Sequence, residues 1–187
     1  MQFRKILRHK PYLFIYTLDE ILAHEAVHSI RVAFDEPKTE EIFSYMTATN
    51  VFRKVLGPII RSEKEVFLFF GLMGGYFTSQ ISWVLSNLKL FSYVSMLFGF
   101  FVLSLITFGL IRLFFVRRKV KKTSKKLFKI FKCKKKSRAV LFRLTDKEIF
   151  EFSKMKKDKI KDFIFESKEK SLRLRLIYLS YFKNINM

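Results

Sequence analysis

Two long stretches of this chain contain no charged residue. Residues 66–88 form one uncharged run and residues 90–111 form a second, and both are rich in Phe, Leu and Ile. A helix needs about 20 mainly apolar residues to cross the hydrocarbon core of a bilayer. The pattern therefore predicts two membrane-spanning helices, joined by a link so short that they form an antiparallel hairpin.

Composition strengthens this interpretation. The chain has 187 residues, is 50% hydrophobic with 24 Phe, and carries a formal net charge of +21. Such high apolar content and high charge are segregated along the chain, which is typical of a membrane protein. Two buried core helices of a soluble protein are the weaker interpretation, because the rest of the chain is too small and too charged to cover both runs.

The distribution of basic residues predicts the orientation. Residues 117–138 contain 13 Lys or Arg and no acidic residue, whereas the link between the apolar runs carries only Lys89. Basic flanks stay in the cytosol, so both termini are expected there, at what we take to be a bacterial cytoplasmic membrane.

The basic segment is expected to bind anionic lipid headgroups. Nucleic acid is the less favoured partner, because the segment adjoins a membrane exit and lacks a recognisable nucleic-acid fold. The sequence does not indicate an oligomeric state.

Residues 24–28 read His-Glu-Ala-Val-His. On a helix, positions i and i+4 lie on one face, so His24 and His28 are expected to bind one zinc ion together. Glu25 lies beside them and is the candidate general base, which would take a proton from the attacking water. This motif is the main sequence evidence for an enzyme.

A third zinc ligand is expected from a carboxylate on the next helix. Residues 17–20 match a capping box that begins the first helix, and Thr39 is expected to cap a second helix that runs to about Leu56. Glu40 and Glu41 lie in the first turn of that second helix. A short antiparallel turn would bring one of the two carboxylates to the histidines, and spacing alone leaves both open.

At this point the chain resembles the gluzincin metallopeptidases, over residues 17–57. Members of that family carry HExxH on one helix and a ligand Glu on the next, often in the pattern Glu-x-x-Ala-Asp. The resemblance favours Glu41, because Glu-Ile-Phe-Ser-Tyr fits that pattern loosely. Tyr45 replaces the Asp, so the supporting carboxylate of the family is either missing or comes from residues 35–36.

Two further residues are candidates for contacts with substrate. Tyr45 lies one turn after Glu41 and is expected either to donate a hydrogen bond to a developing oxyanion or to pack against its neighbours. Arg31 lies three residues after His28. It is expected either to orient a substrate or to form a structural ion pair with Glu40, Asp35 or Glu36, and the ion pair is favoured.

The last part of the chain predicts helices without catalytic chemistry. Thr145 and Glu148 match another capping box, and an apolar stripe follows. Residues 172–181 are ambiguous between helix and strand, and helix is preferred because no second strand is available to pair with them. The expected organisation is an N-terminal HExxH region (1–65), a transmembrane hairpin (66–116), a polybasic juxtamembrane segment (117–138) and a small C-terminal helical region (139–187).

Together these features predict a mainly α membrane protein with a zincin-like pair of N-terminal helices. The leading functional hypothesis is a membrane-anchored zinc metallopeptidase that cleaves a peptide or protein substrate at the cytosolic membrane face. The alternatives are a non-enzymatic membrane scaffold or anionic-lipid-binding protein, and a protein that keeps the zinc only as a structural site.

Overall fold

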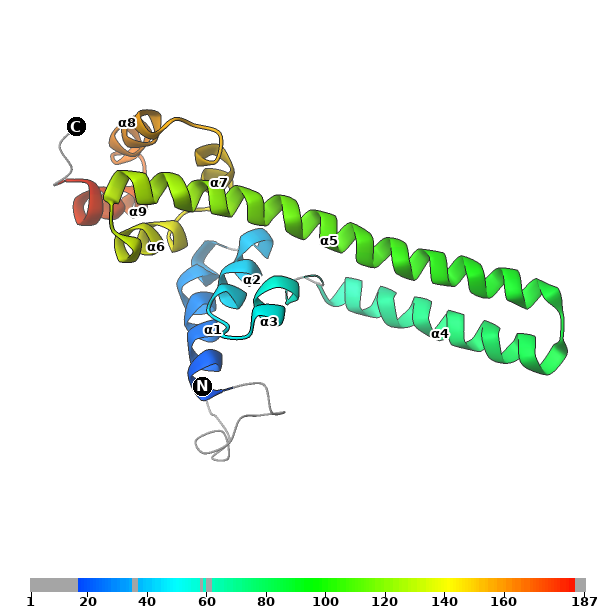
Figure 1. Cartoon of the computed structure of the whole chain (residues 1–187). Coiled ribbons are helices and arrows are strands. Elements are labelled where there is room, and N and C mark those ends of the chain that lie inside the picture. Colours follow the sequence, from blue (N-terminus) through cyan, green and yellow to red (C-terminus); the bar gives the residue numbers. More distant parts are fainter. Residues whose placement is uncertain (1–16, 35–36, 58, 60–61, 184–187) are drawn as a thin grey trace. The chain divides into compact units, whose positions relative to one another are not determined.

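The computed structural model describes residues 17–34, 37–57, 59 and 62–183. This part of the chain contains nine α-helices and no strand, so the prediction of a mainly α fold is confirmed (Figure 1). The helices are α1 Leu18–Arg31, α2 Pro37–Met46, α3 Val51–Leu56, α4 Glu63–Ser86, α5 Lys89–Phe131, α6 Lys134–Phe142, α7 Asp146–Phe152, α8 Lys157–Ser167 and α9 Leu172–Ile177. A 3-10 turn follows α1, and a turn of π-helix over Tyr178–Phe182 follows α9.

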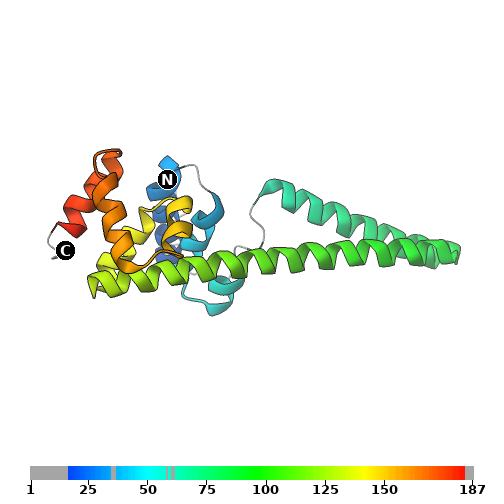
Figure 2. The same cartoon turned by 90° about the horizontal axis from the view of Figure 1, so that it is seen from above.

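The chain divides into two compact units. Residues 55–115 form one, which we call the central unit. Residues 1–54 and 116–187 together form the other, which we call the terminal unit. Helix α5 contributes to both units, and it is one uninterrupted helix (Figure 2).

In the central unit, α4 and the first part of α5 pack against each other as an antiparallel pair (Figure 1). Asn87, with φ 56°, adopts the left-handed conformation that ends α4 and reverses the chain. Close to this turn, Gln80 Nε2 donates a hydrogen bond to Ser95 Oγ at 3.1 Å. At the other end of the pair, the Arg112 guanidinium bonds both carboxylate oxygens of Glu65.

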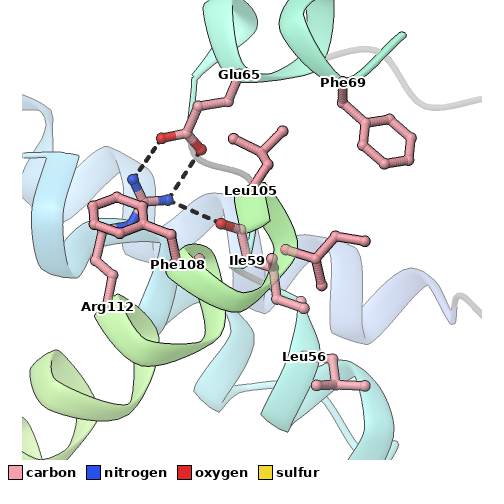
Figure 3. Close-up of a pocket in the computed structure, with 10 residues that line it drawn as sticks. Leu56, Ile59, Glu65, Phe69, Leu105, Phe108 and Arg112 are labelled. Carbon is pink, nitrogen blue, oxygen red and sulfur yellow. Dashed lines mark hydrogen bonds and ion pairs between the residues drawn. The ribbon is translucent and has the colours of Figure 1, made fainter. Parts of the chain in front are cut away.

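This ion pair lies beside a mainly apolar pocket of about 380 Å³ in the central unit (Figure 3). Arg112 also donates to the backbone carbonyl of Ile59 at 2.9 Å. Among the described residues, Glu65 and Arg112 are the only ionisable side chains that line the pocket, and they neutralise each other. The part of the pocket that the structure describes is therefore mainly an apolar surface.

Among the described residues, α5 alone is long and apolar enough to cross a membrane by length and composition. The predicted hairpin of two membrane-spanning helices is therefore corrected to a packed helix pair that contains one candidate span. Helix α4 has 24 residues, but its glycines and the polar stretch at residues 78–80 dilute its apolar character. In α5, only 11% of the most apolar window is buried, so nearly all of that surface faces outward.

The predicted polybasic segment is not a separate linker. Helix α5 continues through the basic residues to Phe131, and α6 begins at Lys134. Val120, Thr123 and Leu127 are buried in the terminal unit. Lys121, Lys122 and Lys125 are exposed, so most of the basic residues between them lie on the outer face of an amphipathic helix, whereas Lys126 donates to backbone carbonyls of the unit.

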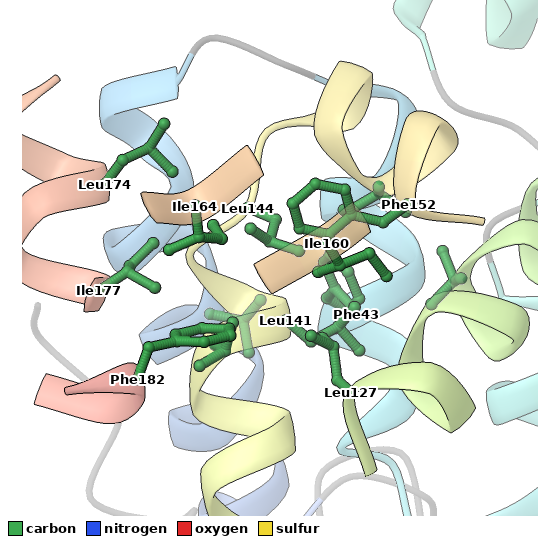
Figure 4. Close-up of a cluster of buried hydrophobic side chains, with 14 residues drawn as sticks. Phe43, Leu127, Leu141, Leu144, Phe152, Ile160, Ile164, Leu174, Ile177 and Phe182 are labelled. Carbon is green, nitrogen blue, oxygen red and sulfur yellow. The ribbon is translucent and has the colours of Figure 1, made fainter. Parts of the chain in front are cut away.

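The core of the terminal unit joins the two ends of the chain (Figure 4). Phe43 of α2 and Leu127 of α5 pack in one buried cluster with apolar side chains of the C-terminal helices. The fully buried members from the C-terminal part of the chain are Val140, Leu141, Leu144, Ile149, Phe152, Ile160, Ile164 and Ile177. The N-terminal helix pair therefore folds onto a core made largely by residues more than 70 positions later.

Local signals explain most helix ends. Thr145 and Glu148 form the complete capping box that the sequence predicts. Thr17 accepts from the backbone N–H of Glu20 at 3.3 Å, but this predicted box is only half formed. The Glu20 side chain instead accepts hydrogen bonds from Thr49, which ties α1 to the segment before α3.

Two other helix predictions have different outcomes. The single helix expected from Thr39 to Leu56 is wrong, because α2 ends at Met46 and α3 begins at Val51. Thr39 lies inside α2, and Asn50 caps the new helix by accepting from the Phe52 N–H at 2.8 Å. The helical interpretation of residues 172–181 is confirmed by α9 and the π turn that follows it.

Candidate metal centre

Helix α1 brings the two histidines of the HEAVH motif together. His24 and His28 are four residues apart, and their Nε2 atoms are 3.1 Å apart. Both side chains are partly exposed, so a solvent ion can reach them. Their convergence is a property of one helix and needs no tertiary contact.

Glu41 completes a group of three ligand atoms. Helix α2 packs against α1, which brings a Glu41 carboxylate oxygen to 3.7 Å from His28 Nε2. One ligand atom each from His24, His28 and Glu41 lies within 4.8 Å of the others. Zinc bonds of ~2.0–2.1 Å in tetrahedral geometry place ligand atoms roughly 3.3 Å apart. The separations of 3.1 and 3.7 Å bracket that value, and the third is within 4.8 Å, so the three residues are a group that could hold a zinc ion.

Glu40 has a different position from Glu41. Its carboxylate lies 2.7 Å from His28 Nδ1, on the side of the ring opposite to Nε2. An Nδ1–H that donates to Glu40 leaves the lone pair of His28 on Nε2, the atom that faces His24 and Glu41. Metal-binding histidines commonly have such a carboxylate partner, which fixes the tautomer and makes the ligand nitrogen more basic. Of the two alternatives from the sequence, Glu41 has the geometry of a ligand and Glu40 that of its support. Residues 35–36, considered earlier for that support, lie outside the described residues.

The surroundings of His24 favour its neutral form. Burial is the largest cause that lowers the pKa of His24, and the nearby His28 lowers it further, while Glu41 and Glu25 partly oppose both. A neutral imidazole keeps the lone pair that a metal requires. Tyr45 packs edge-on against His24, with 5.2 Å between ring centroids. Tyr45 therefore lies beside the metal group, by which we mean His24, His28 and Glu41. This contact is compatible with both of its predicted roles, hydrogen-bond donor and packing residue.

Glu25 follows His24 directly on α1 and is partly exposed. Among the described residues, its carboxylate forms no hydrogen bond or ion pair; only its backbone carbonyl is engaged, by the Ser29 hydroxyl. The charge of Glu25 acts to raise the pKa of His24, against the larger effect of burial. A carboxylate without a structural partner is available to exchange protons with a water beside the metal group.

Arg31 has a structural position. Its side chain is 0% exposed and bonds Asp146 at 3.1 Å. It also donates to Thr39 Oγ1 at 3.0 Å and to the carbonyl of Leu144 at 2.9 Å. The favoured ion pair therefore exists with Asp146, an acid distant in sequence, while residues 35–36, also considered for it, lie outside the described residues. Because the guanidinium is buried in the core, a substrate cannot reach it.

Asp146 was not singled out by sequence reasoning. It receives both Arg31 and the Thr39 hydroxyl, so it joins the end of α1 and the start of α2 to α7. Its position in a capping box is the only sequence signal it carries, and that signal concerns α7 alone. The angle between α1 and α2, and hence the approach of Glu41, is supported by a residue more than 100 positions away.

No family model, curated protein or solved structure matches this chain. The case for a metal centre therefore depends on the residues and their geometry alone.

Proposed function

We propose that the protein is a membrane-anchored zinc-dependent hydrolase of peptide bonds, with a site of the gluzincin type. The observation that carries this proposal is the convergence of His24, His28 and Glu41 within 4.8 Å, with Glu25 next to the first ligand. Two histidines and one glutamate are a ligand set of catalytic zinc, which leaves a fourth position for water or substrate. The three ligands are partly exposed, and an accessible metal is what a hydrolase needs.

Each side chain then has a distinct task. His24, His28 and Glu41 hold the ion, and Glu40 orients His28 through its Nδ1 atom. Zinc bound there supplies Lewis acidity, which polarises a substrate carbonyl and makes a water easier to deprotonate.

Proton transfer and stabilisation of the oxyanion are assigned to two residues beside the three zinc ligands. Glu25 accepts the proton of the attacking water and returns it to the leaving amine. The Tyr45 hydroxyl donates to the oxyanion that develops on the substrate.

Chain connectivity supports the proposed position at the membrane. Residues 55–115 lie along the chain between the two segments of the terminal unit, which is what a segment that enters and leaves the bilayer on one side requires. We propose that α5 crosses the bilayer and that α4 carries the chain in the opposite direction, with both termini on the basic, cytosolic face.

Cysteine labelling tests this arrangement. Cys133 is the only cysteine and lies in the terminal unit. An impermeant maleimide should reach Cys133 only from the cytosolic face. It should reach Asn87→Cys, in a Cys133→Ser background, only from the other face. Labelling of both positions from one face would contradict a crossing.

Metal analysis and a peptidase assay test the hydrolase. Purified full-length protein should contain about one zinc per chain, and His24→Ala should lose it. Glu25→Gln should retain the zinc but lose cleavage of a quenched fluorescent peptide library by at least about a hundredfold, because the general base is removed. Glu169→Gln, an exposed acid in the turn after α8, is the matched control and should leave both readouts unchanged. Absence of zinc from the wild-type protein would refute the proposal.

The alternative is a non-enzymatic membrane scaffold or anionic-lipid-binding protein. The observation in its favour is the unbroken continuation of α5 from its apolar part into the basic part. Under this alternative, Glu25→Gln leaves every cellular phenotype intact, while removal of basic residues in 117–138 does not. A zinc with a fourth protein ligand, in contrast, would indicate a purely structural site.

A further inference from the structure

The terminal unit contains a cleft that is independent of the metal group. It has a volume of about 550 Å³ and lies between the last turns of α5 and the helix α6. This is within the ~300–1,000 Å³ range of small-molecule sites. Six polar residues line the cleft, which we call the basic cleft: Ser124, Lys125 and Lys129 from α5, and Lys134, Ser137 and Arg138 from α6.

The tertiary structure makes this cleft by reversing the chain. Lys132, with φ 51°, adopts the left-handed conformation that ends α5, and its N–H bonds the Phe128 carbonyl at 2.8 Å. Helix α6 starts two residues later, and Figure 1 shows it beside the end of α5. Lys125 and Lys129 are four residues apart on one helix, and Lys134 and Arg138 are four residues apart on the other. Each pair therefore shares a helix face, and the two faces meet at the cleft.

The four cations of the cleft have no structural partner. Within the described part of the chain, none of the four donates a hydrogen bond or forms an ion pair. Neighbouring lysines, in contrast, do form contacts within the fold. Lys126 donates hydrogen bonds to the carbonyls of Phe152 and Ser153, at 3.0 and 2.8 Å. Lys119 lies 4.3 Å from the centre of the Phe150 ring. The donors of the cleft cations are therefore available to a ligand, whereas those of Lys126 are used by the fold.

The charge of the cleft defines the ligand. Residues 117–138 contain no acidic side chain, and among the described residues no carboxylate forms an ion pair with any of the four cations. Like charges at such spacing are unfavourable, and a bound anion would remove that cost. The cleft also contains the Ser124 hydroxyl, and the exposed Phe128 ring forms part of its wall. A phosphate group has several strong acceptor oxygens. It is recognised by several cationic hydrogen-bond donors together with hydroxyl groups.

We propose that the basic cleft binds a phosphate group, either of an anionic lipid headgroup or of a soluble phosphate compound. The four cations come from two helices and line one cleft, so they can contact one anion together. If the basic segment attracts anions only through its net charge, the loss of any four positive charges weakens binding equally. If the anion binds in the cleft, binding depends on which four charges are removed. That difference makes the proposal testable with two variants of equal charge.

The cleft variant replaces Lys125, Lys129, Lys134 and Arg138 with glutamine. The control variant replaces Lys121, Lys122, Lys135 and Lys136 with glutamine, four exposed lysines of the same two helices that do not line the cleft. Each variant loses four positive charges from the full-length protein. All eight residues lie at exposed positions, so neither variant removes a side chain from the core.

Binding is measured in two arms from the slowing of Cys133 alkylation relative to the same variant without probe, because the charges of Lys135 and Lys136 also affect this thiol. Cys133 directly precedes Lys134, so an occupied cleft should slow its alkylation. In neutral detergent the probe is inorganic pyrophosphate. In reconstituted vesicles the comparison is between phosphatidylcholine alone and phosphatidylcholine with phosphatidylglycerol. The cleft variant should lose affinity by at least about a hundredfold and the control variant by less than about tenfold, because direct charge-assisted bonds outweigh distant charges.

The two arms separate the sources of the phosphate. Protection by pyrophosphate supports a soluble phosphate ligand, and protection only by phosphatidylglycerol supports a lipid headgroup. Equal losses in the two variants would overturn the cleft in favour of diffuse attraction. Protection by a single-stranded oligonucleotide, but by neither probe, would overturn it in favour of nucleic-acid binding. Absence of protection by any of the three would also overturn it.

Discussion

The different positions of Glu40 and Glu41 predict different effects on zinc affinity. Glu40 lies 2.7 Å from His28 Nδ1, and its side chain is 19% exposed. Removal of a carboxylate that orients a metal-binding histidine typically weakens metal binding by 10–100-fold, or about 1.4–2.7 kcal/mol. Glu40→Gln keeps an acceptor oxygen but loses the charge, so its effect should be near tenfold. Glu40→Leu removes the acceptor as well and should approach a hundredfold.

Glu41→Gln should have a much larger effect than either change at Glu40. Zinc binds a deprotonated carboxylate, and a neutral amide oxygen is a poor substitute for it. Because a Glu41 oxygen lies 3.7 Å from His28 Nε2, its loss removes one of only three protein ligands in the group. The expected order of affinity is wild type, Glu40→Gln, Glu40→Leu and then Glu41→Gln.

Competition with a chromophoric zinc chelator measures these affinities on the purified full-length protein. Thermal unfolding of each metal-free variant shows whether the helix pair is intact. Glu169→Gln again serves as the control, and its affinity should equal that of the wild type. The reasoning is refuted if Glu40→Gln abolishes binding while Glu41→Gln has little effect, because the two carboxylates would then have exchanged roles.

Three further predictions concern the fold and Cys133. Asp146→Asn should destabilise the protein by about 3–5 kcal/mol in chemical unfolding, because Arg31 is 1% exposed and its buried guanidinium would lose the charge of the carboxylate that it bonds; a change below about 1 kcal/mol would show that the pair is dispensable. The backbone N–H groups at the start of α6, together with the charges of its lysines, lower the pKa of Cys133. Its alkylation rate should therefore rise with pH and level off at a lower pH than that of free cysteine, and a midpoint at or above the free value would contradict this. Gly75→Ala would bring a methyl group 2.6 Å from the Phe98 ring and should cost about 1–3 kcal/mol in detergent, whereas Gly74→Ala has nothing within 4 Å and should be neutral.

The sequence by itself determined the local features of this protein. His24 and His28 share a helix face because the α-helix repeats every 3.6 residues, whatever surrounds it. The capping box at Thr145 and Glu148 forms because its donors and acceptors are three residues apart. The apolar run of α5 is likewise a property of composition, and it identifies a candidate span without any knowledge of packing.

Sequence reasoning went wrong where local signals compete with packing. Residues 66–88 contain no charge and were therefore predicted to span the membrane. An uncharged segment need not be strongly apolar, and α4 contains glycine and uncharged polar residues that lower its hydropathy. The helix expected to reach Leu56 breaks after Met46, where the buried Glu20 of α1 holds Thr49 in a turn. The pKa of Glu20 reflects this contact: burial alone would raise it, but the hydrogen bonds from Thr49 and Arg53 lower it overall.

Only the tertiary structure decided which distant residues act together. Neighbouring residues on a helix point about 100° apart, so the packing angle between α1 and α2 assigns Glu41 to the metal group and Glu40 to the back of His28. That angle is held by the pair between Arg31 and Asp146, whose separation in sequence gives no local signal. The convergence of basic residues at the cleft depends in the same way on one chain reversal at Lys132. Helix periodicity acts within a few residues and is readable from the sequence, whereas contacts across 100 residues depend on how the whole core packs.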